Sequence, residues 1–467
     1  MNKEEGTLSA TFVPKWKPNT AYLAGDAVVS PSGGLVTAKA TFTSSAAYSA
    51  ANWNSASIVG QTRAAEGTQT NGENVILGSF GYIATGGATN SVSGGSPSYE
   101  NVIGGNPANV STATSNLTGA PTLVAPDGNW NSIWGGYDNV VNGWANQVQG
   151  YHCKIHTGAN HATIGGGSVH EVIANSAYGT IGGGTGNKVS ASQATVSGGS
   201  TNNASGNSSS IGGGITNAAS GAGATIGGGT GNTSSASNTT VGGGASNQAT
   251  NTAATVAGGA SNQAGNINAT VAGGSTNIAS GNGSTISGGL TNTASGTSST
   301  VNGGRENTAS GEYSTASGYK AVAAGYGSRA RASGMFAAAG DAQELDWTLR
   351  AATTDGAGKF LQPTGVSFLP ALPDNTTWAF ELTVAARSDT GESAAYKVTG
   401  AIDRGTGAAT TALVGTPTVT VLAEDAAAWN ITAGAGTGDG SLRFTVTGEA
   451  AKNIRWVGRL NVTQVSW

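Results

Sequence analysis

Between Ile181 and Val301 the chain repeats a unit of fifteen residues. Each unit carries a word of the type Thr-Val-x-Gly-Gly, and an asparagine follows six positions after the Val or Ile. A fixed period of this kind predicts a solenoid, in which each repeat stacks on the next. The aligned aliphatic residues are Ile181, Val196, Ile211, Ile226, Val241, Val256, Val271, Ile286 and Val301, and the aligned asparagines are Asn187, Asn202, Asn217, Asn232, Asn247, Asn262, Asn277, Asn292 and Asn307.

The unit contains two short alternating pieces, and alternation at period two indicates strands. Coils of two strands and two turns would stack about 4.8 Å apart. We expect an inward column of aliphatic side chains and a ladder of stacked asparagine amides. The alternative is that the asparagines are present only because turns favour them. In three central coils the residues of this expected ladder are Val241, Asn247, Val256, Asn262, Val271 and Asn277.

The composition restricts how such coils can be stabilised and what they can bind. Charged residues make up only 9% of the chain, against roughly a quarter in an average globular protein. The net charge of −4, without a basic run, makes nucleic acid an unfavourable partner. A coil with an alanine-sized interior buries too little apolar area to offset the entropy cost of ordering its residues. We therefore expect a homotrimer, in which each solenoid buries one face against its copies.

The single cysteine, Cys153, excludes an intrachain disulfide framework. The opening residues contain no apolar signal-peptide core, and no run of about 18 apolar residues follows. We therefore expect a chain that is made in a cytosol and is not inserted into a membrane.

The words N-x-A-S-G-x-x-S-T-V-x-G-G over residues 72–325 resemble the head repeats of trimeric autotransporter adhesins and the same repeats in bacteriophage fibres. The resemblance implies a parallel β-roll within a trimer. Autotransporters also carry a signal peptide and a C-terminal membrane barrel. This chain shows only a final aromatic residue, Trp467, in common with such barrels.

Residues 1–62 differ in composition from the repeats. Trp16, Tyr22, Asp26 and Trp53 stand in an order that resembles a small chitin-binding type of carbohydrate module. Related modules near the N-terminus of phage tail proteins imply glycan binding or attachment to other virion proteins. The alternative is that these aromatic residues form the core of a small β domain.

From Trp347 onward, strand-length runs bounded by Gly, Asp and Asn predict an antiparallel β-sandwich of jelly-roll type. The runs WAFELTVAARSD and IRWVGRLNVTQV resemble the C-terminal domain of phage tail proteins, which implies receptor binding or trimerisation. The stretch before them resembles the adaptor of those proteins. We therefore expect an all-β chain with an N-terminal β domain at 1–62, irregular coils at 63–180, regular coils at 181–316, an adaptor at 317–345 and the sandwich at 346–467.

Phage spikes that cleave glycans use paired acidic residues. From Ile181 to Gly304 the sequence contains no Asp, Glu, His or Arg, so the regular coils supply no general acid or base. The acids of the C-terminal region, such as Asp346, Asp403 and Glu424, are scattered, and no histidine accompanies them. We therefore expect that the chain is not an enzyme and carries no cofactor.

All four histidines and the only cysteine lie between His152 and His170. On a strand, His152 and His156 share one face, and a trimer would bring three copies of each together, which is enough for a metal site. The alternative is that the imidazoles bond to backbone carbonyls in the turns or at the subunit interface. The spacing fits no standard zinc pattern.

Aromatic residues gather in two parts of the chain. Exposed rings can stack on sugars, and the alternative is that they fill an irregular coil or a domain core. The candidates for glycan binding are Trp130, Trp134, Tyr137 and Trp144 before the regular coils, and Trp378, Tyr396, Trp429 and Trp456 in the C-terminal domain.

Together these patterns predict a structural fibre or spike protein on the surface of a bacteriophage virion. We expect its C-terminal tip to recognise a bacterial surface glycan. Two alternatives stay open: a fibre that decorates the capsid without a dedicated receptor, and a spike that degrades glycans.

Overall fold

The structure of the protein is a computed structural model. It describes residues 139–363, 368–425 and 427–467 and, before them, Lys17, Asn19 and short strands between residues 21 and 137. The chain forms two compact units, Met1–Val169 and His170–Trp467.

The first unit begins with short antiparallel strands. Of the residues that resemble a chitin-binding module, Tyr22 and Trp53 lie on these strands, whereas Trp16 and Asp26 lie outside the described residues. The pairs are β1 (Ala21–Tyr22) with β4 (Phe42–Thr43), and β3 (Leu35–Ala38) with both β2 (Ala27–Val29) and β5 (Trp53–Ser55).

Later strands of the first unit pair in parallel. The register shifts within one of these pairs, between Val148 and Gln149, so the coils here are less regular than the repeats that follow. One ladder contains β6 (Val102–Ile103), β8 (Ser132–Tyr137), β10 (Gln147–Tyr151) and β12 (Thr163–Ile164), and the other contains β7 (Val110–Ser111), β9 (Val140–Val141) and β11 (Lys154–Ile155).

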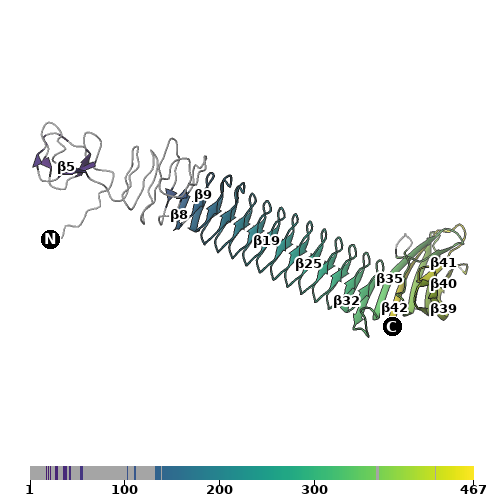
Figure 1. Ribbon diagram of the computed structural model, residues 1–467. Coiled ribbons are helices and arrows are strands. Elements are labelled where there is room, and N and C mark those ends of the chain that lie inside the picture. Colours follow the sequence, from purple (N-terminus) through teal and green to yellow (C-terminus); the bar gives the residue numbers. More distant parts are fainter. Residues whose placement is uncertain are drawn as a thin grey trace, which may run out of the picture. The chain divides into compact units, whose positions relative to one another are not determined.

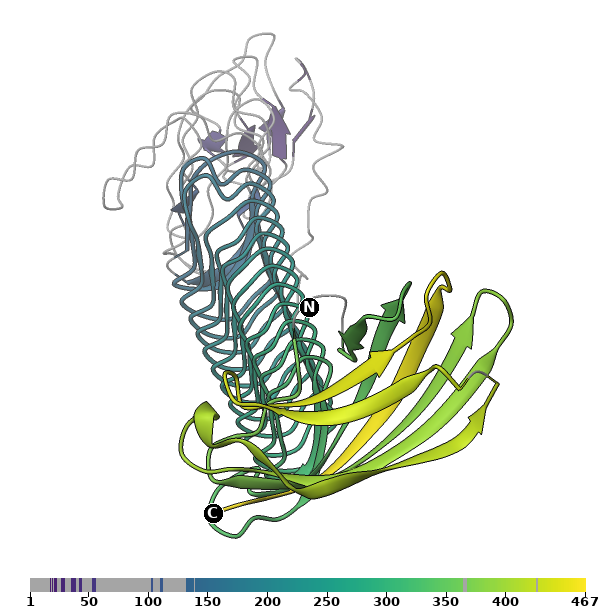
Figure 2. The same cartoon turned by 90° about the vertical axis from the view of Figure 1, so that its right-hand side faces the viewer.

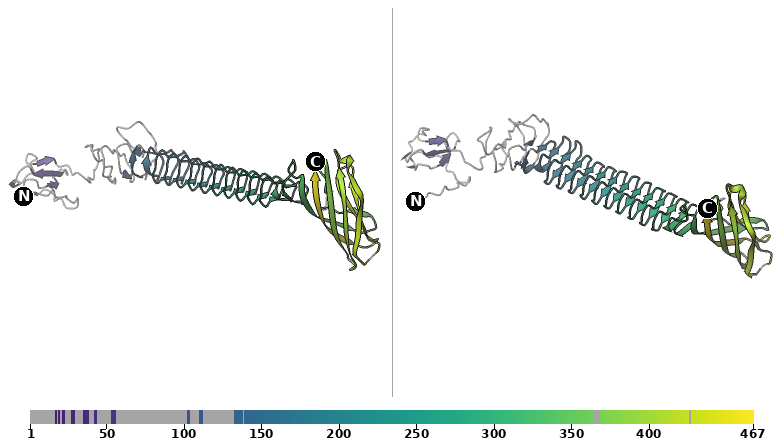
Figure 3. Two further views of the ribbon diagram at one scale, coloured as in Figure 1. Left: turned by 90° about the horizontal axis from the view of Figure 1, so that it is seen from below. Right: turned by 60° about the horizontal axis from the view of Figure 1, so that its bottom comes forward.

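The second unit stacks its coils in strict register (Figures 1 and 3). Each strand pairs in parallel with its equivalent one coil on, as Thr240 does with Thr255. One ladder consists of β14 (Thr180–Ile181), β16 (Thr195–Val196), β18 (Ser210–Ile211), β20 (Thr225–Ile226), β22 (Thr240–Val241), β24 (Thr255–Val256), β26 (Thr270–Val271), β28 (Thr285–Ile286), β30 (Thr300–Val301), β32 (Thr315–Tyr319) and β34 (Arg329–Ser333). The other consists of β13 (Glu171–Val172), β15 (Lys188–Val189), β17 (Asn203–Ala204), β19 (Ala218–Ala219), β21 (Thr233–Ser234), β23 (Gln248–Ala249), β25 (Gln263–Ala264), β27 (Ile278–Ala279), β29 (Thr293–Ala294), β31 (Thr308–Ala309) and β33 (Val322–Ala323).

The two-residue strands explain which positions of the repeat stay constant. Within each strand one side chain points inward and its neighbour points outward, as successive side chains of a strand must. Val241 and Ala249 are completely buried inside their coil, whereas Thr240 and Gln248 face outward. Because the inward strand positions accept only small and β-branched side chains, the repeat keeps these positions and varies the outward ones.

A third line of contacts runs along the coils, and the sequence did not predict this line. Ala245 forms a single-residue parallel bridge with Ala260, and the same position bridges its neighbours throughout the regular coils. Gly244 makes the corner before this bridge, with φ at +89°. A Cβ at Gly244 would lie 2.1 Å from the carbonyl oxygen of Gly259, so both backbone geometry and space require glycine there.

The asparagine column is buried in every regular coil, and its pairing differs from a simple stack of amides. The Oδ1 atom of Asn262 accepts the backbone N–H of Asn277 at 3.0 Å. Its Nδ2 atom donates to the carbonyls of Gly258 and Gly274, both at 2.9 Å. The amides therefore hold the main chains of successive coils, and direct amide–amide bonds add to this only at some positions, such as the 3.1 Å bond from Asn277 to Asn262.

The C-terminal part of the second unit contains two antiparallel sheets that face each other (Figure 2). A short 3₁₀ turn (Ala408–Thr410) follows the second strand of a β-meander in the larger sheet. In order of neighbours, the larger sheet contains β39 (Ala412–Glu424), β38 (Ser393–Arg404), β37 (Thr376–Ser388), β42 (Ile454–Ser466) and β35 (Ala342–Thr353). The smaller sheet contains β40 (Asn430–Gly436), β41 (Ser441–Thr447) and β36 (Gly358–Phe360).

The coils continue into the larger sheet without a break in hydrogen bonding. β34, the last strand of its ladder, pairs antiparallel with β35, where Arg329 opposes Asp346 and Arg331 opposes Glu344. The boundary expected between an adaptor and the sandwich, at residues 345–346, therefore falls inside β35.

The fold class predicted from the sequence is confirmed: the protein is all-β, with a parallel solenoid followed by antiparallel sheets. Within the described residues the only helical element is the 3₁₀ turn. The homotrimer stays a prediction, because it concerns further copies of the chain.

Candidate functional site

An open cleft of about 630 Å³ lies at one end of the C-terminal sheets. Three strands contribute to it: β35 and β42 of the larger sheet and β36 of the smaller one. The residues that line it are Arg350, Ala351, Ala352, Gly358, Lys359, Phe360, Gln362, Arg455, Trp456 and Val457.

Strand register explains how these residues meet. Ala352 on β35 opposes Arg455 on β42, and Arg350 opposes Val457. The chain after β36 is held beside β35 by two backbone hydrogen bonds between Arg350 and Gln362, at 2.7 and 3.0 Å. The cleft is therefore built on regular backbone, which fixes the base of each lining side chain.

A third arginine stands beside the two that line the cleft, Arg350 and Arg455. Arg387 on β37 is the direct register partner of Arg455 on β42, so both side chains project from the same face of the sheet. Both are exposed, as are Arg350 and Lys359. Toward the described residues, the side chains of these four cations make neither a hydrogen bond nor an ion pair within 4.0 Å.

Phe360 gives the cleft an exposed ring, with 41% of its surface open. The guanidinium of Arg443 lies 5.4 Å from the centre of this ring and is bound to Asp439 at 3.1 Å. An exposed ring among cations suits a ligand that combines a sugar face with negative charge.

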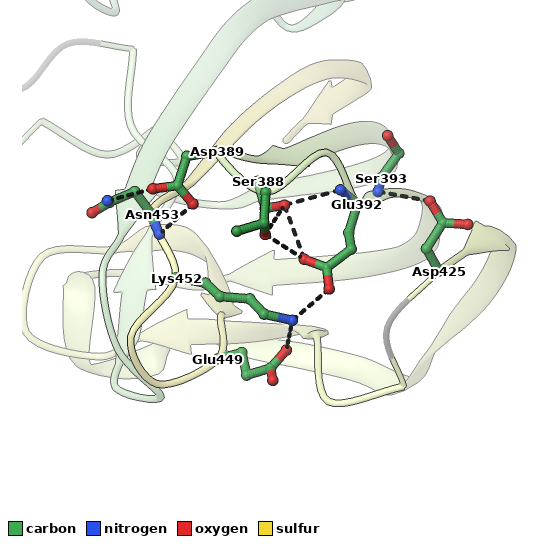
Figure 4. Close-up of polar contacts among 9 residues, drawn as sticks. Ser388, Asp389, Glu392, Ser393, Asp425, Glu449, Lys452 and Asn453 are labelled. Carbon is green, nitrogen blue, oxygen red and sulfur yellow. Dashed lines mark hydrogen bonds and ion pairs between the residues drawn. The ribbon is translucent and has the colours of Figure 1, made fainter.

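Next to the cleft, a polar network ties together the loops at this end of the sheets (Figure 4). Lys452 donates to Glu392 at 2.5 Å and to Glu449 at 2.7 Å. Glu392 also accepts the hydroxyl of Ser388 at 3.0 Å. In the same loops, Asn453 donates to Asp389 at 2.7 Å and the backbone N–H of Ser393 to Asp425 at 2.9 Å. The network connects the β37–β38 turn to the loop before β42.

The protonation of this network points to a structural role. The hydrogen bond from Lys452 holds the pKa of Glu392 below its ordinary value, and bonds to Glu392 and Glu449 raise the pKa of Lys452. A catalytic general acid needs a carboxyl whose pKa is raised. Glu392 therefore does not suit that role, and the ion pairs instead fix the loops beside the cleft.

A second hollow of about 510 Å³ lies farther along the larger sheet. Glu344, Asp346 and Glu381 line it together with Asn461 and Arg459. Asn461 on β42 opposes Asp346 on one side and Glu381 on the other, so these residues form one row across three strands.

The three carboxylates of this second hollow are paired with cations, whereas Arg459 has no ion-pair partner within 4.0 Å among the described residues. Arg329 lies 3.8 Å from Asp346, Arg331 lies 3.8 Å from Glu344, and Lys397 lies 2.9 Å from Glu381. Asp346, which we considered from the sequence as a scattered acid, is thus placed close to other carboxylates by the sheet.

Contrary to the expectation from the sequence, the four candidate rings of the C-terminal domain pack in its core. Trp378, Tyr396, Trp429 and Trp456 are between 0% and 3% exposed. Strand alternation directs Trp378, Tyr396 and Trp456 toward the opposite sheet. Trp429 precedes β40, and its ring packs on that of Trp456 with the ring centres 5.7 Å apart. The indole of Trp378 donates to Gln464 at 2.8 Å, and burial raises the pKa of Tyr396. Their rings have no open face for a sugar.

The aromatic candidates in the first unit lie in other settings. Trp134 and Tyr137 belong to β8, and Trp130 lies outside the described residues. Trp144 is 40% exposed, and its ring meets that of His161 edge to face, with the ring centres 4.6 Å apart. Of this group, Trp144 is the one whose exposure the structure describes.

The histidines do not gather into a ligand set within the described part of one chain, where no group of three or more His, Cys, Asp or Glu could hold a metal. His152 has φ at +52° and its ring contacts Tyr151. In the second unit, His170 accepts the backbone N–H of Asn187 through Nδ1 at 3.1 Å, and so occupies the place of an asparagine in the column.

The cleft could not be found from the sequence, because the cations that line it belong to different strands and the first and last of them, Arg350 and Arg455, are 105 residues apart. A usable signal existed at Arg387 and Arg455, which both occupy outward positions of strongly alternating strands. Only strand order makes them neighbours.

No protein-family model and no curated protein matches the chain. Among solved structures, it is similar to the tailspike protein gp49 of Acinetobacter baumannii bacteriophage Fri1, a capsular polysaccharide depolymerase. That match has 8% sequence identity and a TM-score of 0.20, and it covers 81% of this chain and 70% of the other. At this TM-score, no residue and no substrate is assigned from that protein. In the described residues, no helix has the length and apolarity needed to cross a membrane.

The comparison corrects one expectation from the sequence. The tailspike that the chain is similar to is an enzyme, so our expectation that this chain is not an enzyme is overturned and we do not maintain it. That expectation rested on acids that are scattered along the sequence, whereas the sheet brings Asp346 and Glu381 into one row.

Proposed function

We propose that the chain is a fibre or spike protein on the surface of a bacteriophage virion, and that its C-terminal domain binds a polysaccharide of the bacterial surface. The observation that carries the proposal is the open cleft on a domain that continues a stack of nearly charge-free coils. The coils lead directly into this domain, and the cleft offers cations and an exposed ring. Of the predicted glycan-binding residues, only Trp144 in the first unit keeps a described, exposed ring as a second candidate.

Binding to immobilised bacterial surface polysaccharides tests the proposal. The full chain is applied to a panel of purified capsular and lipopolysaccharide glycans from the host of the phage and from unrelated bacteria. We expect saturable binding to a host glycan and competition by the same glycan in solution. Binding to none of the host polysaccharides would contradict the proposal.

The position on the virion is part of the proposal. We propose that the N-terminal residues attach the chain to other virion proteins, and that the tail carries it. The alternative is a fibre that decorates the capsid without a dedicated receptor. Electron microscopy of virions labelled with an antibody against the C-terminal domain distinguishes label at the tail from label around the capsid.

We also propose that the chain functions as a homotrimer. At four of the regular coils, glycine stands at an outward position where a Cβ would meet no atom of the chain within 4 Å and where φ does not lie in the left-handed region. Packing inside one chain therefore does not account for it, and close approach of another copy does. Light scattering tests this, since a trimer has three times the 45.4 kDa mass of the chain. The glycines at these outward positions are Gly183, Gly198, Gly258 and Gly273.

A second candidate function is cleavage of the bound polysaccharide. The supporting observation is the row of Asp346, Asn461 and Glu381, whose outer members stand two strand spacings apart, about 9–10 Å. Inverting glycosidases hold their two carboxyl groups roughly 6.5–9.5 Å apart. Release of reducing ends from host polysaccharide, lost in both Asp346→Asn and Glu381→Gln, would support cleavage; release that survives both changes would exclude this row.

A further inference from the structure

We infer that the polysaccharide bound at the C-terminal cleft is anionic, carrying a carboxylate or a phosphate on its repeating unit. The inference rests on the proposed function and adds the chemical class of its ligand. It concerns the cluster formed by Arg350, Lys359, Arg387 and Arg455, which we call the cationic cluster.

The cationic cluster has an excess of positive charge that the protein does not neutralise. Arg350, Lys359 and Arg455 line the cleft, and no acidic residue lines it with them. The nearby acids are used elsewhere: Asp355 accepts the backbone N–H of Ala357 at 3.0 Å. The carboxylates of the loop network bind Lys452, Asn453 or the backbone N–H of Ser393. The charge is therefore open to a ligand.

The arrangement of the cluster lowers the stability of the sheet. Arg387 and Arg455 are directly opposite each other on neighbouring strands, where like charges repel. Elsewhere on the same face several cations are paired, as Lys397 is with Glu381 at 2.9 Å and Arg329 with Asp346 at 3.8 Å. A local arrangement of two opposed cations that costs stability is expected at a functional site.

The side chains suit a flexible chain of anions. Arginine presents a planar fork of donors that binds carboxylate or phosphate through two hydrogen bonds. Arg387 and Arg455 are register partners, and Arg350 on the next strand is offset from Arg455 by two residues. The three guanidinium groups therefore start from three successive strands along a diagonal of the sheet and can contact charges on successive units of a linear polymer. Phe360 adds a ring on which the apolar face of a sugar can pack.

The same cluster is a poor site for nucleic acid. Proteins that bind single strands stack successive bases on several aromatic rings along a basic groove. Among the described residues that line the cleft, Phe360 is the only exposed ring, and the whole chain carries a net charge of −4. We therefore assign the site to an acidic polysaccharide.

The test measures binding of the full chain to four immobilised probes. These are polygalacturonate, the same polymer with its carboxyl groups reduced to alcohols, a poly(glycerol phosphate) and double-stranded DNA. We expect binding to polygalacturonate or to poly(glycerol phosphate), and the stronger of the two identifies the anionic group. We expect binding to the reduced polymer to be at least about tenfold weaker, and binding to fall between about 50 and 300 mM salt because the contacts are ionic.

Two matched variants assign the binding to the cluster. In Arg387→Gln/Arg455→Gln we expect about tenfold weaker binding to the acidic polymer, with thermal stability unchanged or raised because the opposed charges are removed. Lys397→Gln removes a half-exposed cation of the same face that already has a partner, and we expect binding within about twofold of the natural chain.

Equal binding to the reduced polymer, equal or tighter binding to DNA, or unchanged binding in the double variant would each overturn the inference. Failure of the inference is distinguishable from failure of the proposed function. If the chain binds a neutral host polysaccharide, and neither salt nor the double variant weakens that binding, the proposed function is retained and the acidic ligand is refuted. A chain that binds no polysaccharide refutes both.

Discussion

Replacing Asn262 with alanine tests whether the buried amides hold the coils together. The change removes both Nδ2 bonds, to Gly258 and Gly274, and removes the acceptor of the Asn277 backbone N–H. The carbonyl of Gly274 keeps its bond from the N–H of Ala260 at 2.9 Å. The part-buried carbonyl of Gly258 and the buried N–H of Asn277 lose the partners that the described structure gives them.

A buried group left without a partner costs about 1–3 kcal/mol, so we expect the stability of this part of the solenoid to fall by about 3–5 kcal/mol. Gln263→Ala, at the next residue but on the outside of the coil, is the control, and we expect a change within about 0.5 kcal/mol. Coils contact only their neighbours, so the loss will appear first as local opening.

Hydrogen exchange of the full chain measures that local opening directly, and urea unfolding followed by circular dichroism measures the wider effect. In Asn262→Ala we expect faster exchange over the coils on both sides of the replaced residue. If exchange and urea midpoint match those of Gln263→Ala, the amide column is not what joins the coils, and the reasoning from its hydrogen bonds is refuted.

Three further predictions concern other parts of the second unit. Gly274→Ala will unfold its coil, because a Cβ there would lie 2.1 Å from a backbone oxygen. Gly273→Ala will leave a single chain folded, because a Cβ there meets no atom of the chain within 4 Å, and light scattering will show a lower tendency to form trimers. Trp378→Ala will cost about 3–5 kcal/mol in urea unfolding, since the ring is 1% exposed. The pKa of Glu392 is lower in the folded protein, mainly through Lys452, so its stabilising effect is present above the unfolded pKa and is lost as pH falls through the folded one. Lys452→Met will therefore reduce the melting temperature near neutral pH and flatten its decline in acid.

The solenoid could be predicted because its determinants are local and repeated. Val241 and Asn247 recur at the same positions in coil after coil, so period and inward positions are readable without any long-range information. The corner at Gly244 and the bridge at Ala245 were missed, because a single-residue bridge leaves no alternating pattern.

The candidate site could be predicted much less well. Aromatic residues suggested sugar stacking. Trp378 and Trp456, however, occupy inward positions of their strands, so their rings pack in the core and are not accessible to a sugar. The cationic cluster depends on β42 lying between β35 and β37, an order that the sequence does not reveal. Arg387 and Arg455 are 68 residues apart, and nothing in either segment alone marks them as a pair.

The pairing of β34 with β35 has a mechanical consequence. A pull on the C-terminal domain enters β35, which is bonded along its length to β42 and, near its start, to the last coil strand. The connecting loop is itself fastened, since Asp341 accepts the backbone N–H groups of Phe336, Ala337 and Ala338. Force therefore passes into the coils through several hydrogen bonds that are loaded together, and not through a single flexible segment of chain. Such a joint resists bending, so a domain attached to a surface would transmit torque to the coils as well as tension.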